Sequence, residues 1–148
     1  AKVRKPTFVS TGMCTWNDID KAVSVFTEQS CPIVLMHSVS EYPCPEEHLN
    51  LAAISSLSKR YGLPVGYSGH ESTVSPSVVA VALGACALER HFTLNRAFWG
   101  TDQAASLEPQ GLRSLVGSVR KFPGLLGSGD KVMTEGERQI SMKLRPGK

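Results

Sequence analysis

Short apolar runs alternate along the chain with longer stretches in which apolar residues have helical spacing. The first run covers residues 7–10, and the helical stretch after it can be capped by Asn17 or Asp18 and extends to about Gln29. The second run, 33–36, is wholly apolar, which is typical of a strand buried on both faces. The alternation then continues through a helical stretch, a strand, a helical stretch, a strand and a final helical stretch, at 49–61, 64–67, 75–83, 86–91 and 108–119. Four strand–helix units in succession predict an α/β fold with a parallel sheet and right-handed crossovers.

This pattern fits two architectures, half of a (β/α)8 barrel or a small doubly wound sheet, and periodicity does not choose between them. An intact barrel needs about 250 residues. A barrel-like pattern in a chain of 148 residues therefore predicts a piece of a barrel. Residues 127–148 are rich in glycine and charge, and we interpret them as a linker or tail.

Composition narrows the class of protein only modestly. Apolar residues make up 41% and charged residues 20%, which is ordinary for a globular domain. The net charge is +3, and no basic stretch is interleaved with aromatic residues, so we expect no nucleic-acid partner. The four cysteines form no CxxC pair, and we interpret them as reduced thiols. With no signal peptide and no apolar run long enough to cross a bilayer, we expect a cytoplasmic protein without a membrane partner.

Histidines lie at the ends of three of the four predicted strands, where parallel α/β folds gather their chemistry. A single histidine at such a place is more often a hydrogen-bonded structural residue than a ligand. His70 and His91, however, lie at the ends of neighbouring strands, and two neutral imidazoles there can share a divalent cation. Water and substrate would fill its other positions, which favours a catalytic ion over a structural one. Glu89 lies two residues before His91 and shares its face of the strand, whereas Arg90 points to the other face.

Six short motifs stand out along the chain, and they cover residues 5–13, 37–45, 64–71, 81–85, 88–94 and 100–109. Their order and spacing resemble the sialic acid (N-acylneuraminate) synthase family. The resemblance begins at Lys5 and continues to about Leu126. The ordered succession of six motifs is far more specific than any one of them.

The resemblance implies a (β/α)8 barrel followed by a small antifreeze-like domain, in a domain-swapped homodimer. Residues 1–126 match the C-terminal half of that barrel, strands five to eight, and 127–148 match the linker to the small domain. The implied reaction condenses phosphoenolpyruvate with N-acetylmannosamine, or its phosphate, to give a nonulosonic acid and phosphate. The implied cofactor is a divalent metal, Mn²⁺ before Mg²⁺ or Co²⁺, acting as a Lewis acid.

Matched residue by residue, the resemblance assigns roles to positions at the strand ends. His70 and His91 match the metal ligands. Tyr42 and Asp102 match residues that contact the amino sugar, and Glu89 lies beside the metal site. We therefore expect catalytic roles for these three residues. The carboxylates of Glu89 and Asp102 can hold sugar hydroxyls or shuttle protons. The positions that match contacts to phosphoenolpyruvate are Ser10, Ser40 and Ser68.

Two positions depart from the common family pattern. Many relatives have Asp where this chain has Gly69 and Asn where it has Ser40, which we interpret as variation in substrate. Legionaminic, pseudaminic or spore-coat sugar synthesis by the same chemistry is therefore an alternative function. The same residues also fit a noncatalytic fragment that only binds sugar or partner subunits.

A half-barrel would lack part of the family's site. The lysines that clamp phosphoenolpyruvate match strands one to four, and a sugar-binding arginine matches the small domain, so we expect these 148 residues alone to be inactive. A half-barrel would also leave two strand edges open. Either the chain belongs to a larger protein or two copies pair edge to edge.

Overall fold

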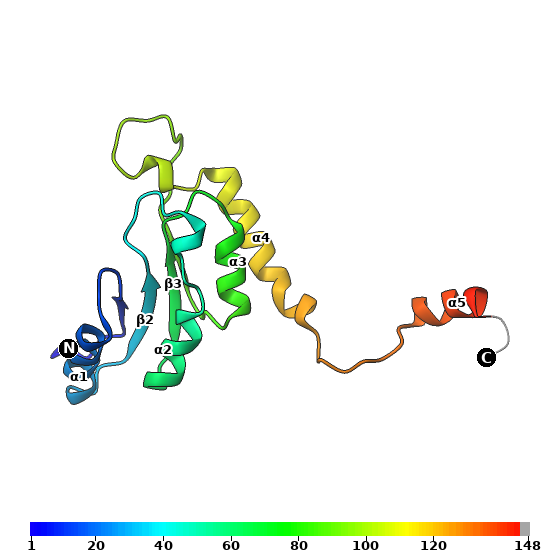
Figure 1. Ribbon diagram of the computed structural model, residues 1–148, viewed down its shortest axis with the longest axis horizontal. Coiled ribbons are helices and arrows are strands. Elements are labelled where there is room, and N and C mark those ends of the chain that lie inside the picture. Colours follow the sequence, from blue (N-terminus) through cyan, green and yellow to red (C-terminus); the bar gives the residue numbers. More distant parts are fainter. Residues whose placement is uncertain (146–148) are drawn as a thin grey trace.

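The computed structural model describes residues 1–145 and has one parallel sheet with strand order β1-β2-β3-β4 (Figure 1). Its strands are β1 (Thr7–Ser10), β2 (Ile33–Ser38), β3 (Val65–Gly69) and β4 (Leu88–Arg90). A helix follows each strand in the chain, and these helices are α1 (Trp16–Glu28), α2 (Ala53–Tyr61), α3 (Ser75–Ala82) and α4 (Pro109–Leu126). Two short 3-10 helices lie in the loops, η1 (Glu46–His48) and η2 (Gln103–Ala105). This arrangement confirms the predicted half of a (β/α)8 barrel.

The core lies between the sheet and the helices that cover one of its faces. Leu35 of β2 and Tyr67 of β3 are 0% and 1% exposed, and they belong to one apolar cluster with Ile54 and Leu57 of α2. Burying a large apolar side chain of this kind contributes about 1.5–3 kcal/mol. These contacts hold the strands in the register that places their carboxyl ends together.

The other face of the sheet, which we call the open face, is uncovered over part of its area. Alternation along the strands places Phe8, Ser10, Ser38, Ser68 and Glu89 on this face. Phe8 is 64% exposed although it lies in a strand. Within residues 1–145, β1 pairs with β2 alone and β4 with β3 alone, so each outer strand has one unpaired edge.

Several helix ends differ from the sequence prediction. Helix α1 is capped by Thr15 rather than Asn17 or Asp18, because the Asp18 carboxylate accepts the Thr15 backbone N–H at 2.9 Å and completes a capping box. Helix α2 begins at Ala53, later than predicted, because η1 and a turn occupy the preceding residues. Helix α4 extends to Leu126 and includes Pro123.

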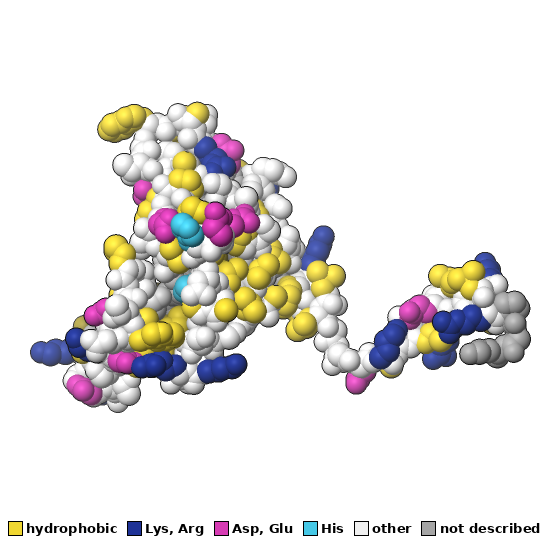
Figure 2. All heavy atoms as spheres, viewed as in Figure 1, with side chains coloured by type: hydrophobic (Ala, Val, Ile, Leu, Met, Phe, Trp, Pro, Cys, Tyr) yellow, Lys and Arg dark blue, Asp and Glu magenta, His cyan; other side chains and the backbone are white. Residues whose placement is uncertain are grey.

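The predicted linker or tail, residues 127–148, contains a helix that the hydrophobic pattern did not predict. Helix α5 (Glu135–Leu144) begins with a capping box in which the Glu137 carboxylate accepts the Thr134 backbone N–H at 2.8 Å. Its apolar side chains are exposed and visible on the separate arm of the molecule (Figure 2). Residues 146–148 of the predicted tail lie outside the described residues.

Across residues 1–145, no helix combines the length and the apolar character that a membrane crossing requires.

Candidate active site

Three aromatic side chains from different loops meet at the carboxyl ends of β3 and β4. His70 follows β3 and His91 follows β4, and their ring centroids lie 5.2 Å apart. The ring of Tyr42, from the loop after β2, lies 4.2 Å from that of His70 and 5.6 Å from that of His91. The backbone N–H of Cys44 donates to the His70 carbonyl at 3.0 Å, which holds the Tyr42 loop against the histidine. The structure therefore brings together the two predicted ligands and one predicted sugar contact.

The hydrogen bonding of His70 prepares one of its ring nitrogens for a metal. Nδ1 lies 2.8 Å from the carbonyl oxygen of Val39, which can only accept, so Nδ1 carries the proton and Nε2 keeps a lone pair. Metal-ligating histidines usually donate their other ring N–H to a carbonyl or carboxylate in this way. Residues 1–145 hold no cluster of three or more His, Cys, Asp or Glu side chains placed for a metal. Two imidazoles nevertheless fit a divalent ion whose other positions belong to water or substrate.

The structure places one of the two predicted carboxylates beside a histidine. Asp102 is exposed just before η2, and its Oδ2 lies 3.8 Å from Nδ1 of His91. Glu89 is exposed on β4, and the sheet register aligns it with Ser68 of β3 and, through it, Ser38 of β2. Asp102 is therefore next to the histidine pair, whereas Glu89 lies on the open face beside the serines.

Hydroxyl groups gather around Gly12, just after β1. Its N–H donates to Oγ of Ser10 at 3.2 Å. A Cβ atom at position 12 would lie 2.4 Å from Oγ of Ser40 and 3.4 Å from Oγ of Ser38, so a side chain there would collide with Ser40. Ser10 and Ser40 thus lie in one hydroxyl cluster with Ser38, which the sequence analysis did not single out, while Ser68 is buried on β3 beside Ser38.

A buried ion pair that sequence reasoning missed lies behind the histidines. Glu71 follows His70 and Arg90 precedes His91, and Nη1 of Arg90 lies 2.8 Å from Oε1 of Glu71, with side-chain exposures of 3% and 0%. Tyr67 donates its hydroxyl to Oε2 of Glu71 at 2.8 Å, and burial raises the pKa of this phenol, so it stays a donor. Burial lowers the pKa of Arg90, and the Glu71 carboxylate opposes that shift. The only sequence signal was the prediction that Arg90 turns away from His91.

His37, the third strand-end histidine, lies on the helix-covered face. It is 6% exposed, its ring stacks with Tyr67 at 6.1 Å, and Nε2 donates to the Leu49 carbonyl at 2.8 Å. Burial lowers the pKa of His37. Its ring is therefore directed away from the pair formed by His70 and His91.

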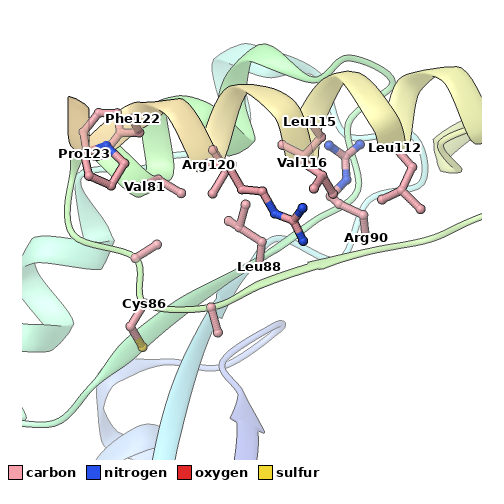
Figure 3. Close-up of a pocket in the computed structure, with 13 residues that line it drawn as sticks. Val81, Cys86, Leu88, Arg90, Leu112, Leu115, Val116, Arg120, Phe122 and Pro123 are labelled. Atoms are coloured by element: carbon pink, nitrogen blue, oxygen red, sulfur yellow. The ribbon is translucent and has the colours of Figure 1, made fainter. Parts of the chain in front are cut away.

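An apolar groove of about 600 Å³ lies between the start of β4 and helix α4. Figure 3 shows Leu88 and Cys86 on one side of this groove and Leu115, Val116 and Phe122 on the other. Its lining is mainly aliphatic but includes Arg90 and Arg120. The groove holds none of the predicted site residues.

Comparison with known proteins settles the family. The sequence profile of the NeuB family matches residues 1–131. The chain belongs to the NeuB family. The chain is similar to an N,N'-diacetyllegionaminic acid synthase of Campylobacter jejuni, with 39% identity over 142 residues that cover 94% of this chain and 42% of that protein. The N-acetylneuraminate-9-phosphate synthase of Homo sapiens is 39% identical over 145 residues, which cover 97% of this chain and 40% of that protein.

Solved structures of NeuB-like proteins have the same fold over this region. The sialic acid synthetase of Leptospira borgpetersenii, solved with citrate, matches 95% of this chain and 49% of its own, with a TM-score of 0.79 and 35% identity. A spore coat polysaccharide biosynthesis protein of Bacillus subtilis matches 92% of this chain and 39% of its own, with a TM-score of 0.80 and 30% identity. This NeuB chain therefore spans less than half the length of the relatives it matches.

Proposed function

We propose that this chain forms the metal-binding part of a sugar-acid synthase that condenses phosphoenolpyruvate with N-acetylmannosamine or its phosphate. The observation that carries the proposal is the meeting of His70 and His91 at neighbouring strand ends, 5.2 Å apart, with Nε2 of His70 free to bind a cation. Membership of a family of sialic, legionaminic and pseudaminic acid synthases supports this chemistry. In this reaction C3 of phosphoenolpyruvate bonds to the aldehyde carbon of the sugar, whose oxygen takes up a proton. Water adds at C2 of phosphoenolpyruvate, and phosphate leaves from C2 to give the nonulosonic acid.

The histidines, carboxylates and tyrosine each have a part in this proposal. His70 and His91 hold the divalent ion, Mn²⁺ before Mg²⁺ or Co²⁺, which supplies Lewis-acid polarisation of the sugar aldehyde. Asp102, 3.8 Å from His91, orients a sugar hydroxyl, and the exposed ring of Tyr42 packs on the sugar. Glu89, exposed on the open face, holds or moves a proton at a hydroxyl of the acceptor.

Phosphoenolpyruvate occupies the open face in this proposal. Ser10 and Ser40 present hydroxyls around Gly12. Ser68 presents a further hydroxyl on β3, the strand that pairs with the strand of Glu89. Hydroxyls can bind carboxylate or phosphate oxygens, although a strong phosphate clamp needs Lys or Arg. We propose that the rest of the enzyme supplies those cations, that the intact enzyme is a cytoplasmic homodimer, and that residues 1–148 alone turn over no substrate.

The proposed reaction is tested in the complete polypeptide that carries these residues. Phosphate release from phosphoenolpyruvate is measured with Mn²⁺ and four acceptors: N-acetylmannosamine, its phosphate, and the precursors of legionaminic and pseudaminic acid. We expect release with one acceptor, a nonulosonic acid by mass spectrometry, and loss of both with a chelator or in His70→Ala. Failure with all four acceptors would contradict the proposed reaction. Turnover with a legionaminic or pseudaminic precursor alone would assign the alternative acceptor class, which the names of several relatives favour.

A further inference from the structure

The buried pair of Glu71 and Arg90 is the centre of a network that joins three elements behind the histidines. Nη1 of Arg90 donates to the Thr73 carbonyl and to Oγ of Ser77, both at 2.9 Å, and Nη2 donates to the Glu71 carbonyl. Ser77 of α3 in turn donates to Oε1 of Glu71 at 3.3 Å. The guanidinium therefore ties β4 to the loop after β3 and to the first turn of α3.

The backbone ladder does not reach the two histidines. Pairing between β3 and β4 ends where Gly69 meets Arg90, one residue before each histidine. Beyond that point the His70 carbonyl accepts from Cys44, and the His91 carbonyl accepts from the backbone N–H of Leu107. The two histidine backbones are thus bonded to separate loops rather than to each other. Past the last paired residues, Gly69 and Arg90, the ends of β3 and β4 are also joined by the ion pair of Glu71 and Arg90, the chain neighbours of the two histidines.

We propose that Glu71 and Arg90 are positioning residues that set the separation and orientation of His70 and His91. This inference rests on the metal site of the proposed function. The pair points away from the open face and has side-chain exposures of 3% and 0%, so it acts through the histidines and does not touch substrate. Gly69 contributes by having no side chain, because a Cβ there would take the space of the Glu71 carboxylate.

A purely structural ion pair and a positioning pair predict different results in a double variant. Arg90→Met leaves the Glu71 carboxylate buried without its partner, so the melting temperature falls. Adding Glu71→Gln removes that unpaired charge, so the melting temperature recovers most of the loss. The contacts of the guanidinium with the Glu71 side chain and carbonyl are still absent in the double variant, so the link between the two histidine segments is still missing. Mn²⁺ affinity therefore stays low although stability returns.

The test measures Mn²⁺ binding by electron paramagnetic resonance and melting temperature in the complete polypeptide. We expect affinity to fall 10- to 100-fold in Arg90→Met and in Glu71→Gln/Arg90→Met, the usual range when groups that orient metal ligands are removed. Arg90→Lys, which keeps a cation, restores part of the affinity. Ile54→Ala, which truncates a buried core side chain of α2, is the matched control that lowers the melting temperature and leaves Mn²⁺ affinity unchanged.

Two outcomes overturn the inference in distinguishable ways. Wild-type Mn²⁺ affinity in the double variant, with affinity lost in His70→Ala, would leave the metal site standing and reduce the pair to a structural role. Absence of Mn²⁺ binding in the wild-type protein would remove the metal site and the positioning role together.

Discussion

Replacing Gly69 by alanine tests the packing behind the site most severely. A Cβ at this position would lie 2.7 Å from Oε2 of Glu71 and 2.7 Å from Cε1 of Tyr67, closer than real Cβ contacts. The carboxylate cannot move away freely, because it accepts the Tyr67 hydroxyl and pairs with Arg90, each at 2.8 Å. The methyl group must therefore either displace the carboxylate or push the ring into the core.

The cost follows from those two routes. Overpacking a filled interior costs about 1–3 kcal/mol, and losing a hydrogen bond to a charged group costs about 1.5–3 kcal/mol. Displacing the carboxylate reduces the overpacking, and displacing the ring spares part of the hydrogen bonding, so the two costs do not add in full. We expect Gly69→Ala to lower the free energy of unfolding by roughly 2–4 kcal/mol. At about 2–4 °C per kcal/mol for a chain of this size, the melting temperature falls by roughly 5–15 °C.

Thermal unfolding followed by circular dichroism measures this loss, and Gly117→Ala is its control. Gly117 lies inside α4 with nothing within 4 Å of the added Cβ, so alanine there should raise stability by about 0.5–1 kcal/mol through helix propensity. A Gly69→Ala protein that melts at the wild-type temperature would refute the argument that the Glu71 carboxylate fills this space.

Three further changes have expected outcomes. Burial lowers the pKa of His37, so as pH falls the unfolded chain takes up a proton on this histidine before the folded protein does. The contribution of neutral His37 to stability is therefore complete above about pH 6.5 and is lost as pH falls below it, by at most about 1.4 kcal/mol per pH unit. Urea unfolding at several pH values should show this slope and His37→Gln should flatten it; an equal slope in both would contradict it. Thr15→Ala removes the α1 capping box and should cost about 0.5–2 kcal/mol in urea, whereas an unchanged midpoint would argue against the cap. Mn²⁺ at 100 times its dissociation constant should add about 2.7 kcal/mol of stability, and a chelator should remove it; a gain that persists in His70→Ala would place the ion elsewhere.

The order of strands and helices could be predicted because each element buries apolar residues with its own period. Helix starts were harder, since they depend on local competition among polar groups. Leu49 and Leu51 extend the helical pattern of α2 backward. The Leu49 carbonyl nevertheless accepts from His37 at 2.8 Å, and α2 begins only at Ala53. An apolar pattern does not report such a bond between elements.

The site could be predicted in part, because strand positions determine which residues lie at the shared edge of the sheet. Parallel strands end at one edge, so the meeting of His70 and His91 follows from their positions one residue past β3 and β4. The alternation of side chains along a strand also predicted that Arg90 lies on the face opposite to Glu89 and His91. Its partner Glu71 could not be predicted, because residue spacing gives no distance between loops. The clustering of Ser38 with Ser10 and Ser40 around Gly12 likewise depends on how two loops close together.

Pulsed electron paramagnetic resonance of Mn²⁺ bound to the complete polypeptide tests the central claim most directly, because nitrogen couplings report imidazoles bound to the ion. The account predicts couplings from two histidine nitrogens, with one lost in His70→Ala and one lost in His91→Ala. Bound Mn²⁺ without nitrogen coupling, or with couplings unchanged in both variants, would contradict the assignment of these histidines as the metal ligands.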